Sequence, residues 1–420
     1  MHHFNHKDGI LHAEDCNLET IADQVGTPFY CYSEATIRRH VRVFSDAFKG
    51  QDALTAFSVK ANSNLSVLKI IANEGAGADV VSGGELKRAR LAGIPANKIV
   101  FSGVGKTADE MALALDEGIH QFNVESEAEL LALNEVATTK GVAAPIAFRV
   151  NPDVSAGGHA KISTGKAEDK FGVPWGHARS IYKKAASLKG INVVGVDVHI
   201  GSQIADLAPF RTAFERVAVL VNDLRADGAI IDRVDLGGGL GISYGDGDAV
   251  PPHPDAYAKL IKEIAGPLGV QLIFEPGRMI VGNAGILVSK VIYDKEGDER
   301  RFLIIDAAMN DLIRPALYDA HHDIIPVRKK TGNETLHYDV VGPICETGDR
   351  FAIERPIEKI APGELVAFMS AGAYGAVQAS QYNTRALVPE VLVNGRNFAV
   401  IRKRPSFEEM LVLEGDAPWL

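Results

Sequence analysis

Residues 53–75, ALTAFSVKANSNLSVLKIIANEG, contain the unit that decides the fold. The run ALTAFSV is apolar and β-prone, whereas in SNLSVLKIIANEG apolar residues recur three and four positions apart before a glycine. The first pattern is typical of a strand, and the second is typical of an amphipathic helix that ends at the glycine. We therefore predict a strand followed by a helix.

The same unit recurs between about residues 50 and 280. Strands that alternate with helices indicate a parallel sheet. Eight units match the size of an α/β fold of the (β/α)8 (TIM-like) barrel type, and an open doubly wound sheet is the alternative. The eight β-prone runs are residues 53–59, 78–81, 98–101, 119–124, 145–150, 193–199, 232–236 and 271–275.

After about residue 285 the sequence consists of β-prone runs separated by turns, with few long helical patterns. This predicts an all-β domain, a sandwich or a barrel, and the strand-like segment TPFYCYS at residues 27–33 is expected to join it. The expected domains are a barrel at residues 36–280 and a β domain formed by residues 1–35 and 281–420.

Composition narrows the class of protein. The 420 residues are 46% hydrophobic and carry a net charge of −10, which gives no support for a nucleic-acid partner. No apolar window approaches the roughly 18 residues that a membrane span needs. The cysteines at positions 16, 31 and 345 cannot all pair, which favours a reducing, cytoplasmic location. The histidines at positions 2, 3 and 6 lack partner ligands at fixed spacing, so no metal site is expected.

In such a barrel, active residues follow the C-terminal ends of the strands. Lys60 stands there after the first strand, where partial desolvation would favour a neutral amine that attacks an aldehyde. An exposed lysine at a strand end is the alternative. Other chemistry-bearing residues at these ends are Asp79, Ser82, His199, Gly237, Gly238, Gly239, Glu275 and Arg278.

Two of these strand ends favour a phosphorylated ring as ligand. In VDLGGGLGISYG, three consecutive glycines leave backbone N–H groups open to a phosphate, and Ser202 of HIGSQ offers a second contact. In FEPGR, Glu275 could keep a pyridine nitrogen protonated, and Arg278 could grip a carboxylate or a phosphate. A glycine-rich turn without ligand and a local Glu–Arg pair are the alternatives.

The β region offers fewer signals. Cys345, beside Glu346 in GPICETGD, is either a thiol that delivers a proton to carbon or a buried small apolar residue. Chemistry alone assigns no role to Tyr374 of AGAYGAVQASQYN or to Arg314 and Tyr318 of NDLIRPALYDA.

With VKAN, HIGSQ, GGGLG, EPGR, CE and AGAYG in this order, nearly the whole chain resembles the fold-type III pyridoxal-5'-phosphate decarboxylases. That family combines a barrel with a β domain. The segment HAKISTGKAEDKFGV (residues 159–173), with RPALYDAHHDI and GPICETGD, is similar to its diaminopimelate decarboxylase branch. Thr347 stands where serine is expected, a mild departure.

The resemblance implies roles for individual residues. Lys60 would bind the cofactor covalently, His199 would stack on its ring, and Glu275 would face its pyridine nitrogen. Cys345 would be the proton donor, and with Glu346 it would reach the site of a partner subunit in a homodimer. The implied cofactor-binding set is Lys60, Asp79, His199, Ser202, Gly238, Gly239, Glu275, Gly277, Arg278 and Tyr374. The implied substrate-binding set is Arg278, Arg314, Tyr318, Glu346 and Tyr374.

The reaction so implied converts meso-2,6-diaminopimelate to L-lysine and CO2, the last step of lysine biosynthesis. Two arginines suit the distal carboxylate of this substrate, and ornithine lacks that group. The alternatives are an ornithine- or arginine-type decarboxylase, an amino-acid racemase of related fold, and a non-catalytic regulatory homologue.

Overall fold

The computed structural model describes residues 2–154, 170–245, 249–330, 332 and 334–419. The chain folds into two compact units. We call Ile37–Ser243 with Asp248–Ile280 the barrel unit, and Met1–Thr36 with Tyr244–Gly247 and Val281–Leu420 the β unit. No helix in the described part of the chain is long and apolar enough to cross a membrane.

The barrel unit contains a closed ring of parallel strands. Strand β13 pairs with β5 and strand β9 pairs with β8, so the sheet has no free edge between them. The predicted barrel is confirmed, and the open sheet is wrong. In ring order the strands are β5 (Ala53–Ser58), β6 (Gly77–Val80), β7 (Ile99–Phe101), β8 (Gln121–Val124), β9 (Ala144–Asn151), β11 (Ile191–Asp197), β12 (Arg233–Asp235) and β13 (Gln271–Phe274).

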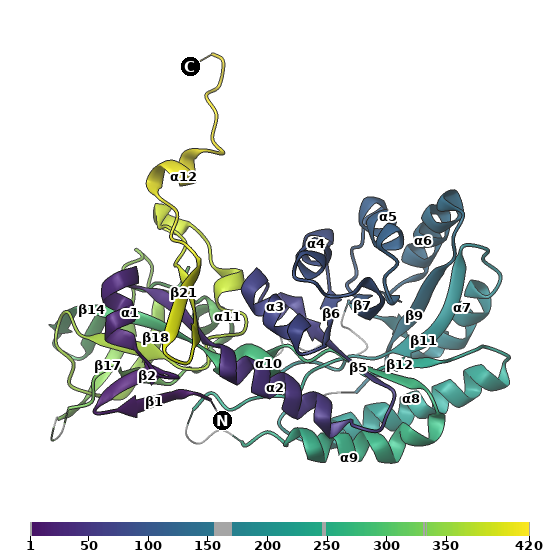
Figure 1. Ribbon diagram of the computed structural model, residues 1–420, viewed down its shortest axis with the longest axis horizontal. Coiled ribbons are helices and arrows are strands. Elements are labelled where there is room, and N and C mark those ends of the chain that lie inside the picture. The colour runs from purple at the N-terminus through teal and green to yellow at the C-terminus, as the bar shows by residue number, and fades with distance from the viewer. Residues whose placement is uncertain (1, 155–169, 246–248, 331, 333, 420) are drawn as a thin grey trace. The chain divides into compact units, whose positions relative to one another are not determined.

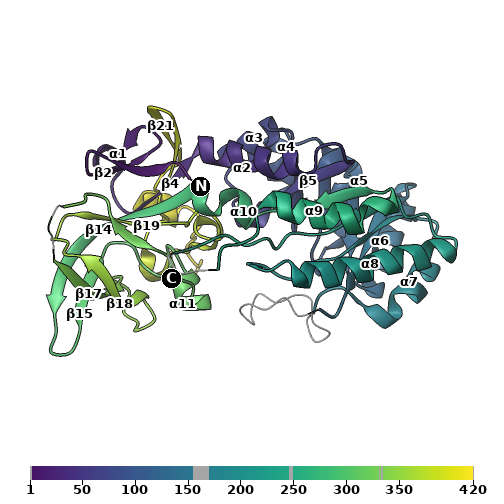
Figure 2. The ribbon, with the colours of Figure 1, turned by 90° about the horizontal axis from the view of Figure 1, so that it is seen from below.

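Helices follow the strands of the ring and cover its outside (Figure 1). Figure 2 shows α8 (Ala208–Ala226) and α9 (Pro254–Ile264) side by side, and residues of the two helices contact one another. Helix α2 (Glu34–Ala47) precedes the first strand. The others are α3 (Leu65–Asn73), α4 (Gly83–Leu91), α5 (Ala108–Glu117), α6 (Glu127–Lys140), α7 (Ala178–Ala185), α8 (Ala208–Ala226), α9 (Pro254–Ile264) and the short α10 (Arg278–Val281).

Capping residues fix where several of these helices begin. The side chains of Asn64, Ser82 and Ser126 accept hydrogen bonds from backbone N–H groups in the first turns of α3, α4 and α6. Thr107 and Glu110 form a reciprocal capping box at the start of α5. The loops before these four helices therefore end at a defined residue.

Alternation along strand β13 decides which side chains enter the barrel. Phe274 packs outward against Phe44 of α2 and Phe48 just after it, with ring centroids 5.8 and 4.0 Å apart. Because successive side chains of a strand point to opposite faces, Ile273 and Glu275 face the interior. Ile273 joins a small apolar cluster with Leu54, Ala56 and Val100. The interior of the barrel is thus apolar at Ile273 and polar at the next inward-facing position, Glu275, two residues later.

The β unit is a strand-rich body with few short helices. Strand β4, from the N-terminal part of the chain, lies between β14 and β20, antiparallel to the former and parallel to the latter, so the N-terminal segment joins the β unit as predicted. The sheet order is β18-β17-β15-β14-β4-β20-β21, and β19 pairs with β14 and β16. The strands are β4 (Phe29–Ser33), β14 (Gly285–Glu296), β15 (Arg301–Ile305), β16 (Ile324–Pro326), β17 (Thr335–Val341), β18 (Arg350–Glu358), β19 (Leu365–Phe368), β20 (Glu390–Asn394) and β21 (Asn397–Arg402).

Smaller elements complete the β unit. A separate three-stranded sheet precedes helix α1. The elements are β1 (Phe4–Lys7), β2 (Ile10–Ala13), β3 (Cys16–Asn17), α1 (Leu18–Val25), α11 (Arg314–Tyr318) and α12 (Phe407–Leu411).

Candidate active site

Lys60 lies in a single 3-10 turn, Val59–Ala61, directly after strand β5. Its Nζ donates a hydrogen bond to Asp79 Oδ2 at the end of β6 (2.9 Å). The Lys60 side chain is 36% exposed and that of Asp79 is fully buried, so the amine is tethered but accessible. Ser58 Oγ donates to the same Asp79 oxygen at 2.8 Å. The ends of strands β5 and β6 thus hold the Lys60 amine in a defined position.

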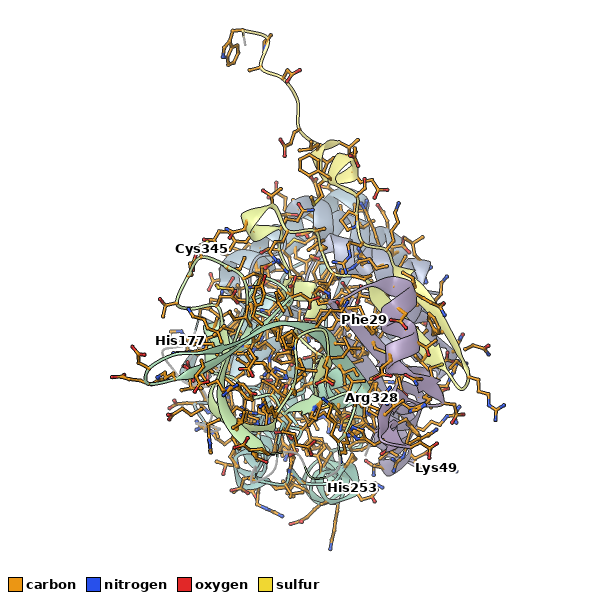
Figure 3. The ribbon with its side chains drawn as sticks, turned by 90° about the vertical axis from the view of Figure 1, so that its left-hand side faces the viewer. Phe29, Lys49, His177, His253, Arg328 and Cys345 are labelled. Atoms are coloured by element: carbon orange, nitrogen blue, oxygen red, sulfur yellow. The ribbon has the colours of Figure 1, made fainter. Side chains whose placement is uncertain are left out.

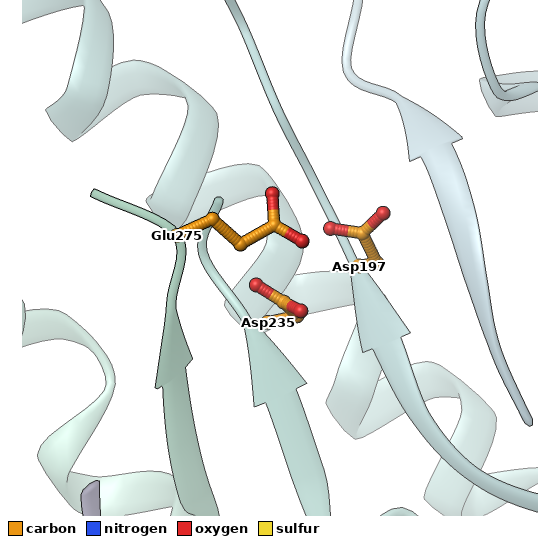
Figure 4. Close-up of side chains that lie close together, drawn as sticks. All are labelled: Asp197, Asp235 and Glu275. Atoms are coloured by element: carbon orange, nitrogen blue, oxygen red, sulfur yellow. The ribbon is translucent and has the colours of Figure 1, made fainter. Parts of the chain in front are cut away.

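Glu275 follows β13 and is one of three carboxylates that meet inside the barrel. Asp197 and Asp235 end the neighbouring strands β11 and β12, and one oxygen of each of the three lies within 4.8 Å of the others (Figure 4). Burial, and after it the charges of Asp235 and Asp79, raise the pKa of Glu275 well above its usual value. Burial and the charge of Asp197 do the same to the pKa of Asp235.

Polar side chains from two further strands contact these carboxylates. Ser102 Oγ, just after β7, donates to Glu275 Oε1 at 3.0 Å. Asn123 Nδ2 of β8 lies 3.2 Å from Glu275 Oε1 and 3.1 Å from Asp235 Oδ2. Both donors favour an ionised acceptor, because a hydrogen bond to a carboxylate stabilises its charged form.

His199 lies two residues beyond the end of β11, beside the glycine run. Its Nδ1 accepts a hydrogen bond from the Gly238 N–H at 3.1 Å. Burial, Arg149 and Lys60 together lower the pKa of His199 well below its usual value. The ring is therefore neutral at pH 7, with Nδ1 as acceptor.

The glycine run packs too closely on its neighbours to carry side chains. A Cβ at Gly238 would lie 2.3 Å from the Glu275 carbonyl oxygen, and one at Gly239 would lie 2.6 Å from the Gly201 carbonyl oxygen. The backbone at Gly239 has a φ of 108°, which also favours glycine. Among the described residues no hydrogen-bond acceptor is found for the Gly239 N–H, which leaves it open to an anion.

Two more predicted residues lie near this run. Arg278 Nη2 donates to Ser202 Oγ at 3.0 Å, and Ser202 directly follows Gly201. A Cβ at Gly277 would lie 3.0 Å from Ser58 Cβ and 3.1 Å from Ala61 Cβ, on either side of Lys60. The barrel unit therefore brings the predicted strand-end residues together, from Lys60 to the glycine run, whereas the Ser82 side chain caps helix α4.

Arg149 of β9 is a barrel residue that the sequence analysis missed. It is buried, and its Nη1 lies 3.3 Å from Glu125 Oε1. Its Nη2 is buried without a hydrogen-bond partner among the described residues. A guanidinium in this state is suited to a polar ligand, because an unpaired buried donor is unfavourable.

In the β unit, Arg314 is buried and tightly held. Its Nη1 donates to His322 Nε2 at 2.8 Å, and its guanidinium lies over the Tyr244 ring at 4.5 Å from the centroid. Tyr318, at the end of α11, is 3.5 Å from the Gln378 amide nitrogen. Tyr374 has a φ of 56°, a left-handed backbone that is unfavourable for a bulky residue and often marks functional sites.

Cys345 and Glu346 lie on a loop between β17 and β18. Cys345 is exposed, so the alternative of a buried small residue is wrong (Figure 3). Glu346 accepts a hydrogen bond from the Tyr382 hydroxyl, which raises the pKa of that tyrosine. Asp349 anchors the loop, because its two oxygens accept from the backbone N–H groups of Met309 and Ile344, each at 2.7 Å.

Two cavities are lined by other residues. One, of about 540 Å³, is at the N-terminal end of the barrel strands and includes Lys98, His120 and Gln271 in its lining. The other, of about 360 Å³, is in the β unit and is lined in part by Thr347 and Arg350. No predicted site residue lines either one. Of the family-like segment at residues 159–173, residues 159–169 lie outside the described part of the chain.

Comparison with known proteins places this geometry in a family. Residues 34–282 match the family described as pyridoxal-dependent decarboxylase, pyridoxal binding domain. The chain is 50% identical over 420 residues to diaminopimelate decarboxylase of Zymomonas mobilis, with 99% of each protein covered. It is 47% identical over 415 residues to that of Haemophilus influenzae, again with 99% of each covered.

Solved structures agree with these relatives. Diaminopimelate decarboxylase from Helicobacter pylori, complexed with L-lysine, has a TM-score of 0.91 at 40% identity, with 95% of this chain and 99% of that chain covered. The enzyme from M. jannaschii in co-complex with L-lysine has a TM-score of 0.94 at 37% identity, with 99% and 98% covered. The chain therefore belongs to the pyridoxal-dependent decarboxylases and, within them, to the diaminopimelate decarboxylase family.

Proposed function

We propose that the protein removes one carboxylate of meso-2,6-diaminopimelate, giving L-lysine and CO2, with pyridoxal 5'-phosphate as cofactor. The observation that carries this proposal is the convergence of an amine, a buried carboxylate and a glycine turn at one end of the barrel. The full-length similarity to diaminopimelate decarboxylases supports the substrate, as does the lysine bound to two relatives. The reaction is the last step of lysine biosynthesis.

The barrel residues fit pyridoxal phosphate on structural grounds. The accessible amine of Lys60 suits its aldehyde. The open N–H of Gly239, with Ser202 and Arg278 nearby, suits its phosphate. Side chains at Gly238 and Gly239 would collide with neighbouring carbonyl groups, so the backbone there is free for a close approach.

When bound, pyridoxal phosphate supplies an electron sink for the bond to the departing carboxylate. Glu275 would hold a proton on the pyridine nitrogen, and the neutral His199 ring would support the cofactor ring. Asp79 positions the Lys60 amine, which would bind the cofactor aldehyde. These roles agree with the buried position of Glu275 and the lowered pKa of His199.

Substrate recognition is proposed to rest on charge. Arg278 and Arg314 each suit a distal carboxylate, and Glu346 suits a distal amine, while Tyr318 and Tyr374 offer hydroxyl groups for hydrogen bonds. Arg314 is prepared for this role because His322 and Tyr244 already hold its guanidinium. Ornithine lacks the distal carboxylate, so it would leave an arginine unpaired.

Cys345 is the proposed donor of the proton that replaces CO2 on the product carbon. We expect its exposed thiol, with the neighbouring Glu346, to serve the site of a second copy of the chain in a homodimer. Mixing Lys60→Ala with Cys345→Ala would test this. Random re-pairing of two inactive variants should restore about a quarter of the activity if sites are shared, because half of the dimers then carry one complete site. No recovery, with mixed dimers shown by mass, would contradict shared sites.

Attachment of the cofactor can be tested without turnover. Borohydride reduction of the loaded protein followed by peptide mapping should place the cofactor on Lys60. Lys60→Ala should show no covalent label, whereas Lys98→Ala, at the other end of the barrel, should be labelled like the wild type. Label on another lysine would contradict the proposed site.

A cytoplasmic location is proposed as well. It is supported by the three free cysteines, which fit a reducing compartment.

A further inference from the structure

The three carboxylates inside the barrel are too close and too buried to be ionised together. The exposed fractions of Asp197, Asp235 and Glu275 are 2%, 0% and 5%. Asp197 and Asp235 end strands β11 and β12, Glu275 directly follows the adjacent β13, and Figure 4 shows their carboxylate groups facing one another. Like charges at this separation, away from water, force at least one group to keep a proton. The hydrogen bonds around the three groups indicate which of them carries the proton.

Hydrogen-bond donors are unevenly distributed over the cluster. Glu275 Oε1 receives the Ser102 hydroxyl and the Asn123 amide. Asp235 accepts from the Gly237 N–H through Oδ1 at 3.0 Å and from Asn123 through Oδ2 at 3.1 Å. Two donors each favour the ionised forms of Glu275 and Asp235.

Asp197 has the opposite surroundings. Its Oδ1 is buried and has no hydrogen-bond partner among the described residues. A buried carboxylate oxygen without donors is unfavourable, whereas a protonated carboxyl is itself a donor that a neighbouring carboxylate can accept. The negative charge is therefore least favourable on Asp197.

We infer that Asp197 holds the proton of this cluster and acts as a positioning residue that leaves Glu275 ionised toward the cofactor nitrogen. The inference deepens the proposed function and rests on it for the role of Glu275. The location of the proton itself does not depend on which substrate is decarboxylated.

The charged groups around Asp197 agree with this assignment. Burial is the largest cause that raises its pKa, followed by the carboxylate of Glu275, and Glu125 and Asp79 add to it. Arg149 opposes them, but its guanidinium already lies 3.3 Å from Glu125. The net effect raises the pKa of Asp197 well above its usual value. The pKa values of Asp235 and Glu275 are raised too, so the choice among the three rests on the hydrogen-bond donors.

Infrared spectroscopy of the cofactor-loaded protein tests the inference directly. A protonated carboxyl has a carbonyl stretch that carboxylates lack, and variant-minus-wild-type spectra isolate one residue. At pH 8, Glu85, whose pKa burial raises to about 7, is mostly ionised and contributes little. Asp197→Asn should remove one carboxyl band, whereas the matched Asp235→Asn should retain it. A band that survives in Asp197→Asn, or disappears only in Asp235→Asn, would overturn the inference.

Kinetics give a second, independent readout. An asparagine at position 197 is neutral and can still donate, so Asp197→Asn should change kcat/KM by less than about threefold and leave its pH profile unshifted. Asp197→Leu removes the donor and should weaken cofactor binding. Equal losses in Asp197→Asn and Asp197→Leu would show that the ionised carboxylate is needed, which contradicts the inference.

A cation held by the three carboxylates is the competing outcome. In that case chelation with EDTA would release a metal and change the infrared spectrum of the wild type, and no protonated band would be assigned to Asp197. If the protein proves inactive on diaminopimelate, the proposed function fails, while the infrared comparison still decides where the proton lies.

Discussion

Adding one methyl group at Gly238 should disable the site while leaving the fold intact. The new Cβ would lie 2.3 Å from the Glu275 carbonyl oxygen, about 1.1 Å inside the 3.4 Å at which ordinary contact begins. The contact is with backbone, so a side-chain rotation cannot relieve it. Either β13 or the glycine turn must move, and the turn also donates to His199 through the Gly238 N–H.

The expected effect has two parts. Overpacking of this size destabilises a protein by about 1–3 kcal/mol. A displacement of about 1 Å at a reacting group can lower the rate about 100-fold. Gly238→Ala should therefore fold, lose affinity for pyridoxal phosphate in an absorbance titration, and show a kcat/KM on meso-diaminopimelate lower by about 100-fold.

Gly84→Ala is the matched control, because it makes the same chemical change in helix α4. There the new Cβ meets only Ser82 Oγ, at 3.7 Å. A glycine replaced by alanine inside a helix is expected to stabilise by about 0.5–1 kcal/mol. If Gly238→Ala binds cofactor and turns over like Gly84→Ala, the close contact between the glycine turn and Glu275 does not organise the site.

Three further predictions concern other parts of the molecule. Asp349→Asn weakens the anchor of the Cys345 loop, so it should lower the free energy of unfolding by about 1–3 kcal/mol in a denaturant titration. It should also lower kcat, while the affinity for the cofactor in an absorbance titration stays unchanged. Arg314→Lys loses the planar contact with Tyr244 and should raise KM for diaminopimelate in steady-state assays. Lys106→Met leaves the buried Glu129 unpaired and should destabilise by about 3–5 kcal/mol at pH 8. Burial raises the pKa of Glu129 in the folded protein, so the folded state takes up a proton more readily than the unfolded state and the free energy of unfolding falls as the pH rises. The loss in Lys106→Met should therefore be smaller at pH 5 than at pH 8, which unfolding midpoints measured at the two pH values check.

The fold could be predicted because each repeating unit has a local pattern of apolar residues that distinguishes its strand from its helix. Each of the eight predicted runs overlaps a strand of the ring, since strands and helices differ in the spacing of their apolar residues. The strand-end rule then pointed to Lys60 and Glu275, because parallel strands carry their active residues at one end.

The partners of these residues were harder to predict. Asn123, Ser102 and Asp235 also stand at strand ends, so a search for polar residues in the last inward position of each strand could have found them. Their distances depend on how far each strand is shifted along the closed ring, and no local pattern records that shift. Likewise, the left-handed backbone of Tyr374 has no sequence signal, because tyrosine rarely adopts it.

The most direct test of the central claim is to incubate the protein, loaded with pyridoxal phosphate, with meso-diaminopimelate, L-ornithine or L-arginine, and to measure CO2 and the amine product. We expect CO2 and L-lysine in equal amounts from diaminopimelate, and no CO2 from the other two. CO2 from ornithine or arginine but not from diaminopimelate would contradict the proposed recognition of a distal carboxylate. No CO2 from any of the three, with cofactor bound, would contradict the proposed reaction itself.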